Sequence, residues 1–199
     1  KLPAGQYWIT GAPIIQHEMS HSLLDSLSFA VPAIVIMITI VLIVAFRSWV
    51  AVLLSVATIT LALIWTMGTL AWLDRPVNLV TSIVPPVIIT LGLAYAMHLL
   101  AEYFAASKDE NHQLITDNAA RIKKTLSEVS LPLLVTGVTT AAGFLALMLN
   151  PLAAVKEFAV LSAMGVGYTV FLCLVFLPAG LKLLQCPSTG KAPGEALFH

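Results

Sequence analysis

Gly92-Leu93-Ala94-Tyr95-Ala96-Met97-His98 is a run of small, aromatic and ionisable residues inside an apolar segment that covers residues 85–102. A tyrosine and a histidine are costly at membrane depth unless they have partners, so an ionisable residue there indicates a functional site. The middle of the run is also informative, because Ala94 offers only a methyl group. Tyr95 and His98 are therefore the groups of this run that can exchange a proton or a hydrogen bond.

The composition around this run is that of a membrane protein. The chain has 199 residues, of which 59% are hydrophobic and 10% charged, and its mean hydropathy is +0.94. These values exclude an ordinary soluble domain, and the net charge of zero argues against nucleic acid as a partner. Five charge-free stretches each exceed the roughly 20 residues that cross a bilayer: 26–46, 48–73, 76–101, 129–155 and 158–181. The sequence predicts an all-α membrane protein with five transmembrane helices and amphipathic surface helices.

The hydrophobic pattern divides the chain into six segments. Residues 1–13 hold a short predicted strand at 7–10, and residues 14–28 form an amphipathic helix that leads into the first span. Three spans occupy 29–104. Residues 105–130 are the longest polar segment and show a 3.6-residue apolar period, which predicts an amphipathic helix on the membrane surface. Two further spans occupy 131–184, and 185–199 are a tail.

Proline and small residues add detail to the spans. Pro85 and Pro86 remove backbone donors from the third span, which predicts a helix break there. Small residues lie four apart in the last two spans, which lets helix backbones approach closely. We interpret this spacing as packing inside the bundle rather than as a dimer contact. The residues are Gly137 with Ala141, Ala163 with Gly167, and also Gly143 and Gly165.

The basic residues predict how the chain is oriented in the membrane. Seven lysines and arginines fall on one side of the five spans and three on the other, and the richer side is expected to be cytoplasmic. The N-terminus is then periplasmic and the C-terminus cytoplasmic. The richer side holds Arg47, Lys108, Arg121, Lys123, Lys124, Lys182 and Lys191, and the other side holds Lys1, Arg75 and Lys156.

His17-Glu18-Met19-Ser20-His21 matches the zinc-protease pattern H-E-x-x-H. On a helix, His17 and His21 share one face and could bind zinc, with Glu18 as the general base. A third ligand is required, and Asp25 is poorly placed because a helix climbs about 6 Å over four residues. We favour the alternative, in which these residues form the polar face of an amphipathic helix. Accordingly, we expect no enzyme activity, no metal and no cofactor.

Tyr95 and His98 have two interpretations. Histidine changes charge near neutral pH and can relay protons, and a tyrosine hydroxyl can share the hydrogen bond. Alternatively, His98 lies near the cytoplasmic interface and pairs with Glu102 one turn further on. Thr139 and Thr140 in the fourth span have the same ambiguity, since hydroxyls in membrane helices often bond back to the i−4 carbonyl and do nothing else.

Several motifs occur in the order in which they appear in one family of membrane transporters. They are Thr10-Gly11-Ala12-Pro13, Phe46-Arg47-Ser48, Arg75-Pro76-Val77-Asn78-Leu79-Val80-Thr81, the run from Gly92 to Leu100, Thr139-Thr140-Ala141-Ala142-Gly143-Phe144, Lys156-Glu157-Phe158 and Leu177-Pro178-Ala179. In this order and spacing, over residues 10–184, the chain resembles one transmembrane half of a resistance–nodulation–division (RND) transporter. The resemblance is to the MMPL or predicted-exporter branch, which is related to the sterol-sensing domain.

The resemblance implies an architecture and a function. The five spans correspond to the second to sixth helices of a six-helix half, residues 1–13 to the end of the extracytoplasmic porter domain, and the whole to a piece of a longer chain. Family members export lipids, hydrophobic compounds or drugs across the bacterial cytoplasmic membrane with the proton gradient. Expected partners are membrane lipids, a hydrophobic substrate, and either the other half with its porter domain or further copies of the same chain.

The chain departs from the family at one position. By the resemblance, the relay acid of this helix would stand at Ala94, where none is present. The relay acid then lies in the other half, or His98 substitutes for it, or this half is passive and closer to a sterol-sensing role. We therefore expect an RND/MMPL-like exporter of lipids or other hydrophobic compounds. The alternatives are a sterol- or lipid-sensing module without transport, and a membrane zinc protease.

Overall fold

The computed structural model describes residues 12–46, 48–74, 78, 80–106 and 117–184, and for residues 12–27 it describes the backbone alone. In these ranges it contains α-helices and short 3₁₀ turns but no strand, which confirms the predicted all-α fold class. The predicted strand at 7–10 lies outside the described residues. The helices are α1 (Ala12–Phe46), α2 (Trp49–Trp72), α3 (Val84–Ala105), α4 (Asn118–Ala146) and α5 (Ala153–Leu183), and the 3₁₀ turns are Thr81–Ile83 and Leu147–Leu149.

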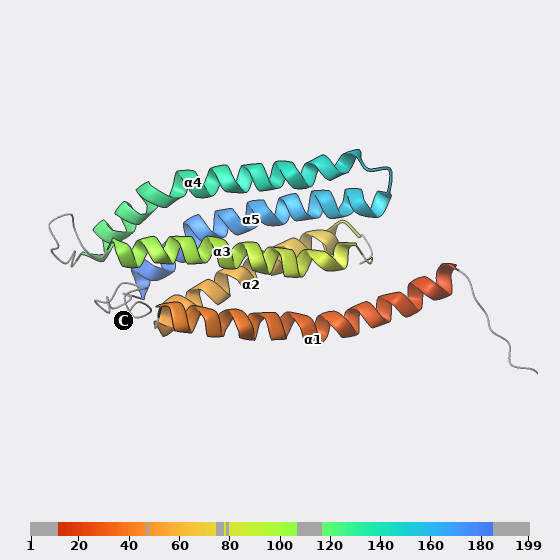
Figure 1. Cartoon of the computed structure of the whole chain (residues 1–199), viewed down its shortest axis with the longest axis horizontal. Coiled ribbons are helices and arrows are strands. Elements are labelled where there is room, and N and C mark those ends of the chain that lie inside the picture. The colour runs from red at the N-terminus through yellow and green to blue at the C-terminus, as the bar shows by residue number, and fades with distance from the viewer. Residues whose placement is uncertain (1–11, 47, 75–77, 79, 107–116, 185–199) are drawn as a thin grey trace, which may run out of the picture.

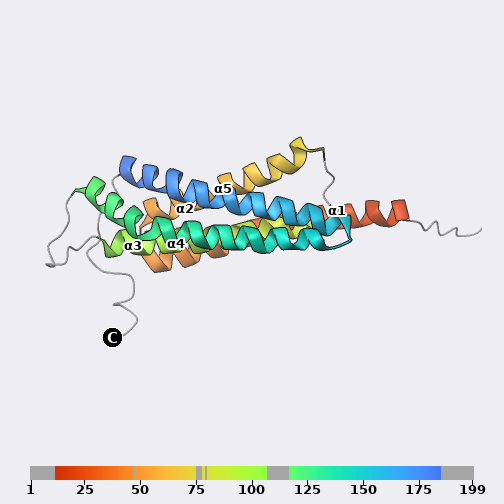
Figure 2. The same cartoon turned by 90° about the horizontal axis from the view of Figure 1, so that it is seen from above.

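The five helices lie side by side along the long axis of the molecule, and each runs opposite to the one before it (Figures 1 and 2). α5 packs against α2, α3 and α4, whereas α1 packs against α2 and α3. The C-terminal ends of α3 and α5 therefore meet the N-terminal end of α4 at one end of the bundle (Figure 1). This arrangement brings residues from three helices together there.

Each helix is long and apolar enough to cross a membrane, as the charge-free stretches predicted. The spanning segments are Ser28–Phe46, Trp49–Trp72, Thr81–Ala105, Asn118–Leu149 and Ala153–Leu183. Large apolar side chains point outward along them, for example Leu131 (68% exposed) and Val138 (67% exposed) on α4. Such outward-facing apolar side chains suit contact with lipid or with other membrane helices. The chain is a multi-pass membrane protein.

The two amphipathic segments are continuous with the spans that follow them. α1 runs without interruption through residues 14–28 to Phe46, and α4 begins at Asn118 and continues past residue 130. A proline inside each helix, Pro32 or Pro132, does not end it. Proline is tolerated inside membrane helices where neighbouring groups take up the freed backbone carbonyl. The sequence predicts that the first of these segments leads into its span, but it predicts a separate surface helix over 105–130, and composition alone does not reveal that α4 is continuous.

Pro85 and Pro86 lie in the first turn of α3. The backbone N–H groups of a first turn have no acceptor within the helix, so prolines there cost little. The irregular backbone lies just before them, in the 3₁₀ turn Thr81–Ile83. Asn78 anchors that turn, because its side-chain oxygen accepts hydrogen bonds from the backbone N–H groups of Val80 (3.0 Å) and Thr81 (2.9 Å).

Glycines let the helices approach one another at only some of the predicted positions. A Cβ atom added at Gly165 would lie 2.5 Å from Cδ1 of Ile88 on α3, and one at Gly137 would lie 2.6 Å from Cγ2 of Val170 on α5. Packing inside the bundle is therefore found at these two glycines. Gly143 and Gly167 differ, since a Cβ there would meet no atom within 4 Å.

Candidate functional site

The residues of the Gly92–His98 run divide between two faces of α3. Ala94 and His98 are exposed, together with Thr90 and Ala101, and they form one stripe at helical spacing. Tyr95 points the other way and is only 3% exposed. The structure therefore does not join Tyr95 and His98 in one hydrogen-bonded pair.

Tyr95 reaches into the interior between α3, α4 and α5. The side chains of Thr140 on α4 and Cys173 on α5 lie beside its hydroxyl. The hydroxyl is nevertheless without a hydrogen-bond partner among the described residues. The Thr140 hydroxyl donates its own proton to the carbonyl of Thr136 at 2.7 Å. Two of the predicted site residues, Tyr95 and Thr140, are thus brought together from different helices.

Replacing Tyr95 by phenylalanine tests whether this hydroxyl stabilises the fold. A buried polar group without a partner costs about 1–3 kcal/mol, so Tyr95→Phe is expected to leave the free energy of unfolding unchanged or to raise it by about 1 kcal/mol. Thermal unfolding of the purified protein in detergent measures the effect. A clear loss of stability would show that the hydroxyl has a partner in the folded protein.

The threonine hydroxyls of α4 bond back to their own helix. Thr139 donates to the carbonyls of Val135 and Thr136, each at 3.0 Å, and is exposed. Thr140 donates to Thr136 and faces Tyr95. This is the local bonding that threonine commonly makes in membrane helices, so these bonds do not mark either residue as functional. Thr140 differs from Thr139 because it lies beside Tyr95.

The zinc pattern lies where the structure gives the backbone alone. His17 and His21 fall within α1, and the positions of their side chains are not among those described. Among the side chains that are described, no group of three or more histidine, cysteine, aspartate or glutamate residues could hold a metal ion.

A buried arginine is the main feature that the sequence interpretation missed. Arg121 on α4 is only 4% exposed. Its guanidinium carbon lies 4.2 Å from the centre of the Tyr103 ring, and its Nη2 donates to the Tyr103 carbonyl at 3.2 Å. The Tyr103 hydroxyl donates to the side chain of Asn118 at 2.8 Å, and the Asn118 amide donates to the carbonyl of Leu181 at 3.0 Å. These contacts join α3, α4 and α5 at one end of the bundle.

The four-residue spacing of Arg121, Thr125 and Val129 is the one sequence feature that pointed to this arginine, because it places all three on one face of a helix. The structure buries that face of α4. In the sequence, however, Arg121 is one of three basic residues within four positions, and such a cluster is typical of a cytoplasmic loop.

The opposite end of the bundle joins two of the quoted motifs. The side-chain amide of Asn78 donates to a carboxylate oxygen of Glu157 at 3.2 Å. Asn78 belongs to the loop before α3, and Glu157 lies in the first two turns of α5. The contact joins two motifs 79 residues apart, because the asparagine that shapes the turn before α3 also bonds to α5.

Two comparisons with known proteins bear on the family of the chain. The model of the MMPL family matches residues 3–189. A protein of Methanocaldococcus jannaschii, named only as a predicted membrane protein, is 29% identical over 177 residues. The match covers 89% of this chain and 44% of that relative, so the chain spans less than half of the relative's length.

Proposed function

Because this chain belongs to the MMPL family, we propose that it is the transmembrane part of an exporter that moves lipids or other hydrophobic compounds with the proton gradient. The chain supplies a membrane-spanning bundle of helices, and this supports a role in transport. The substrate would move as one helix unit rocks against another.

The exposed stripe of α3 carries this proposal. His98 lies seven residues before the end of the helix, which is about 10 Å from that end. An ionisable side chain at this depth that faces lipid is costly, whereas one that faces another protein surface or a water-filled path is not. Thr90, Ala94 and Ala101 beside it are small, so another helix can approach closely. The stripe therefore suits coverage by the other transmembrane half or by a further copy of the chain.

His98 is the proposed proton carrier of this half. Ala94 precedes it on the same stripe and has no group to protonate, so the proton path between the two halves would depend on His98 and on acids of the covering half. Tyr95 lies inside the bundle with the partly buried Thr140 beside it, and the two would act on the packing of α3 against α4 rather than in that path.

The proposed location is the bacterial cytoplasmic membrane, with the N-terminus periplasmic and the C-terminus cytoplasmic. The bundle end where α4 begins and α5 ends supports this orientation (Figure 1), since Arg121, Lys123, Lys124 and Lys182 lie within the adjoining turns. Basic residues are concentrated on the cytoplasmic side of membrane proteins.

A lipid-sensing module without transport is the second candidate, and Ala94 favours it. If the missing acid means that this half does not relay protons, the bundle could still bind a sterol or another lipid. Such a protein would bind lipid with no dependence on a proton gradient.

The test is a flux assay with the full-length protein that contains this chain. The protein is reconstituted in proteoliposomes with a fluorescent phospholipid, and movement of the probe is followed with and without a pH gradient. We expect His98→Ala to lower gradient-driven flux by about tenfold or more, equivalent to a transition state raised by roughly 1.4 kcal/mol.

Thr90→Val is the matched control, because Thr90 lies on the same stripe two turns away and cannot carry a proton; its flux should match the unmodified protein. Full proton-coupled flux in His98→Ala would remove the relay role from this half. Lipid binding without any gradient-driven flux in the unmodified protein would favour the sensing module.

A further inference from the structure

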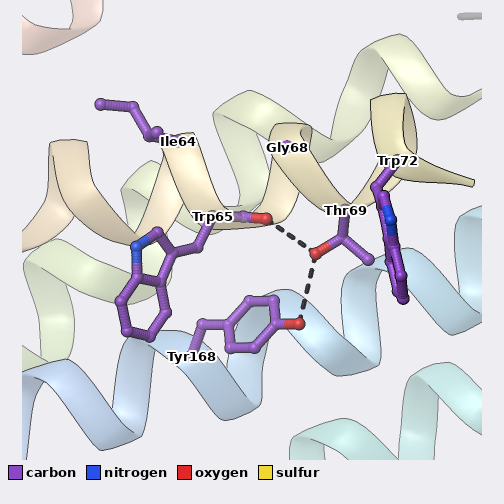
Figure 3. A pocket seen from close by; sticks show the side chains of 6 residues that line it. All are labelled: Ile64, Trp65, Gly68, Thr69, Trp72 and Tyr168. Carbon is purple, nitrogen blue, oxygen red and sulfur yellow. Dashed lines mark hydrogen bonds between the residues drawn. The ribbon is translucent and has the colours of Figure 1, made fainter.

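A groove with a volume of about 390 Å³ opens on the outer surface between α2 and α5 (Figure 3). Trp65, Gly68, Thr69 and Trp72 of α2 line it together with Ile64, and α5 contributes Tyr168. Its size is in the range of small-molecule sites in proteins. The groove is separate from Tyr95, His98 and the α3 stripe.

The aromatic wall of the groove is held in place by its own contacts. The Trp65 indole meets the Tyr168 ring edge-to-face, with ring centres 5.8 Å apart at 88°, and stacks on Phe171 at 6.5 Å. Edge-to-face and offset-stacked pairs are favourable geometries for aromatic rings. The part of the wall formed by Trp65 and Tyr168 is therefore in place before any ligand arrives, which lowers the cost of binding.

Gly68 opens the groove. Glycine in the middle of a helix is destabilising relative to alanine, and the usual reason to keep one is close packing. That reason is missing here, because a Cβ at Gly68 would meet no atom within 4 Å. The absence of a side chain instead keeps the groove open at this point of its lining.

Two hydroxyls give the groove its chemical preference. The Thr69 hydroxyl donates to the carbonyl of Trp65 at 2.8 Å, so in its 3.2 Å contact with Tyr168 the tyrosine is the donor (Figure 3). Both protons are then used, and the Tyr168 oxygen keeps its capacity to accept. A ligand that satisfies this oxygen must bring a hydrogen-bond donor. The lining residues carry no charge to hold a phosphate or an amine.

We propose that this groove binds a neutral lipid whose headgroup is a hydroxyl. The hydroxyl would donate to Tyr168, and the apolar body would lie over Gly68 against the indoles of Trp65 and Trp72. A phosphodiester headgroup fits less well: the indole N–H groups of Trp65 and Trp72 could donate to it, but it has no proton to donate to Tyr168, and no lining residue balances its negative charge. Binding at this site does not depend on the proposed transport, because an exporter and a lipid sensor could both use it.

Photo-crosslinking in nanodiscs tests the site. The full-length protein is placed in phosphatidylcholine nanodiscs that contain a trace of a photoactivatable diacylglycerol, or of a photoactivatable phosphatidylcholine with the same acyl chains. Labelled peptides are then identified by mass spectrometry. The diacylglycerol is expected to label the α2 and α5 peptides of the groove at least about fivefold more than the phosphatidylcholine, the factor that one hydrogen bond supplies.

Three variants separate shape from hydrogen bonding. Gly68→Leu fills the groove, so the lipid loses its contacts there, and diacylglycerol labelling should fall by about fivefold or more. Gly167→Leu adds the same side chain to equally open space on α5 outside the groove lining, and should leave labelling unchanged. Tyr168→Phe should remove the preference for diacylglycerol while phosphatidylcholine labelling stays the same. Equal labelling by the two probes, or undiminished labelling of Gly68→Leu, would overturn the proposal.

Discussion

Gly165→Leu is expected to lower the free energy of unfolding by about 3 kcal/mol, at the upper end of what overpacking a core usually costs. The Cβ alone would lie 2.5 Å from Cδ1 of Ile88 and 3.0 Å from Cγ2 of Thr66. Both neighbours are fully buried and belong to different helices, α3 and α2. Three further carbon atoms cannot be accommodated without moving α5 away from these two helices, which are among its main packing partners.

Gly167→Leu is the matched control for this substitution. It lies two residues further along the same helix and gains the same helix propensity, but a Cβ there meets no atom within 4 Å. Thermal unfolding of both variants in detergent should therefore show a large loss for Gly165→Leu and none for Gly167→Leu. Equal losses would mean that leucine harms α5 for a reason other than contact with Ile88 and Thr66.

The difference between Gly165 and Gly167 also shows what the sequence could and could not predict about the bundle. The five spans follow from charge-free length, which depends only on the chain itself and the thickness of a bilayer. Which glycines are packed depends on how each helix is rotated, and spacing alone does not fix that rotation. Gly143 and Gly137 lie on the same helix and share the small-residue signal, yet only Gly137 contacts a neighbour closely.

The same limit applies to the candidate site. The sequence placed Tyr95 and His98 one turn apart, where a shared hydrogen bond is possible. The structure separates them because the interior lies on the Tyr95 side of α3, and that side is set by α4 and α5 rather than by α3 itself. Conversely, the contact between Asn78 and Glu157 was contained in the motifs but could not be inferred without the fold.

Arg121→Ala is expected to destabilise the protein by about 3 kcal/mol, through loss of a charge-assisted hydrogen bond and a desolvated cation–π contact. The guanidinium donates to the Tyr103 carbonyl and lies 4.2 Å from the centre of the Tyr103 ring. Its Nε has no hydrogen-bond partner among the described residues, so some desolvation cost is already present in the folded protein. Removing the arginine relieves that cost, which keeps the expected loss below the sum of the two contacts.

A double-mutant cycle isolates the ring contact from the rest of this network. Arg121→Met keeps most of the volume and removes the charge, Tyr103→Phe keeps the ring, and Tyr103→Leu removes it. If the charge acts on the ring, Arg121→Met should cost about 1–2 kcal/mol less in the Tyr103→Leu background than in the Tyr103→Phe background. Both backgrounds lack the hydroxyl that bonds Asn118, so this bond cancels in the comparison.

Equal costs would assign the role of Arg121 to its hydrogen bond to the Tyr103 carbonyl, which both backgrounds keep. In either case the arginine acts where α3, α4 and α5 meet, so its loss should loosen all three helices at that end together.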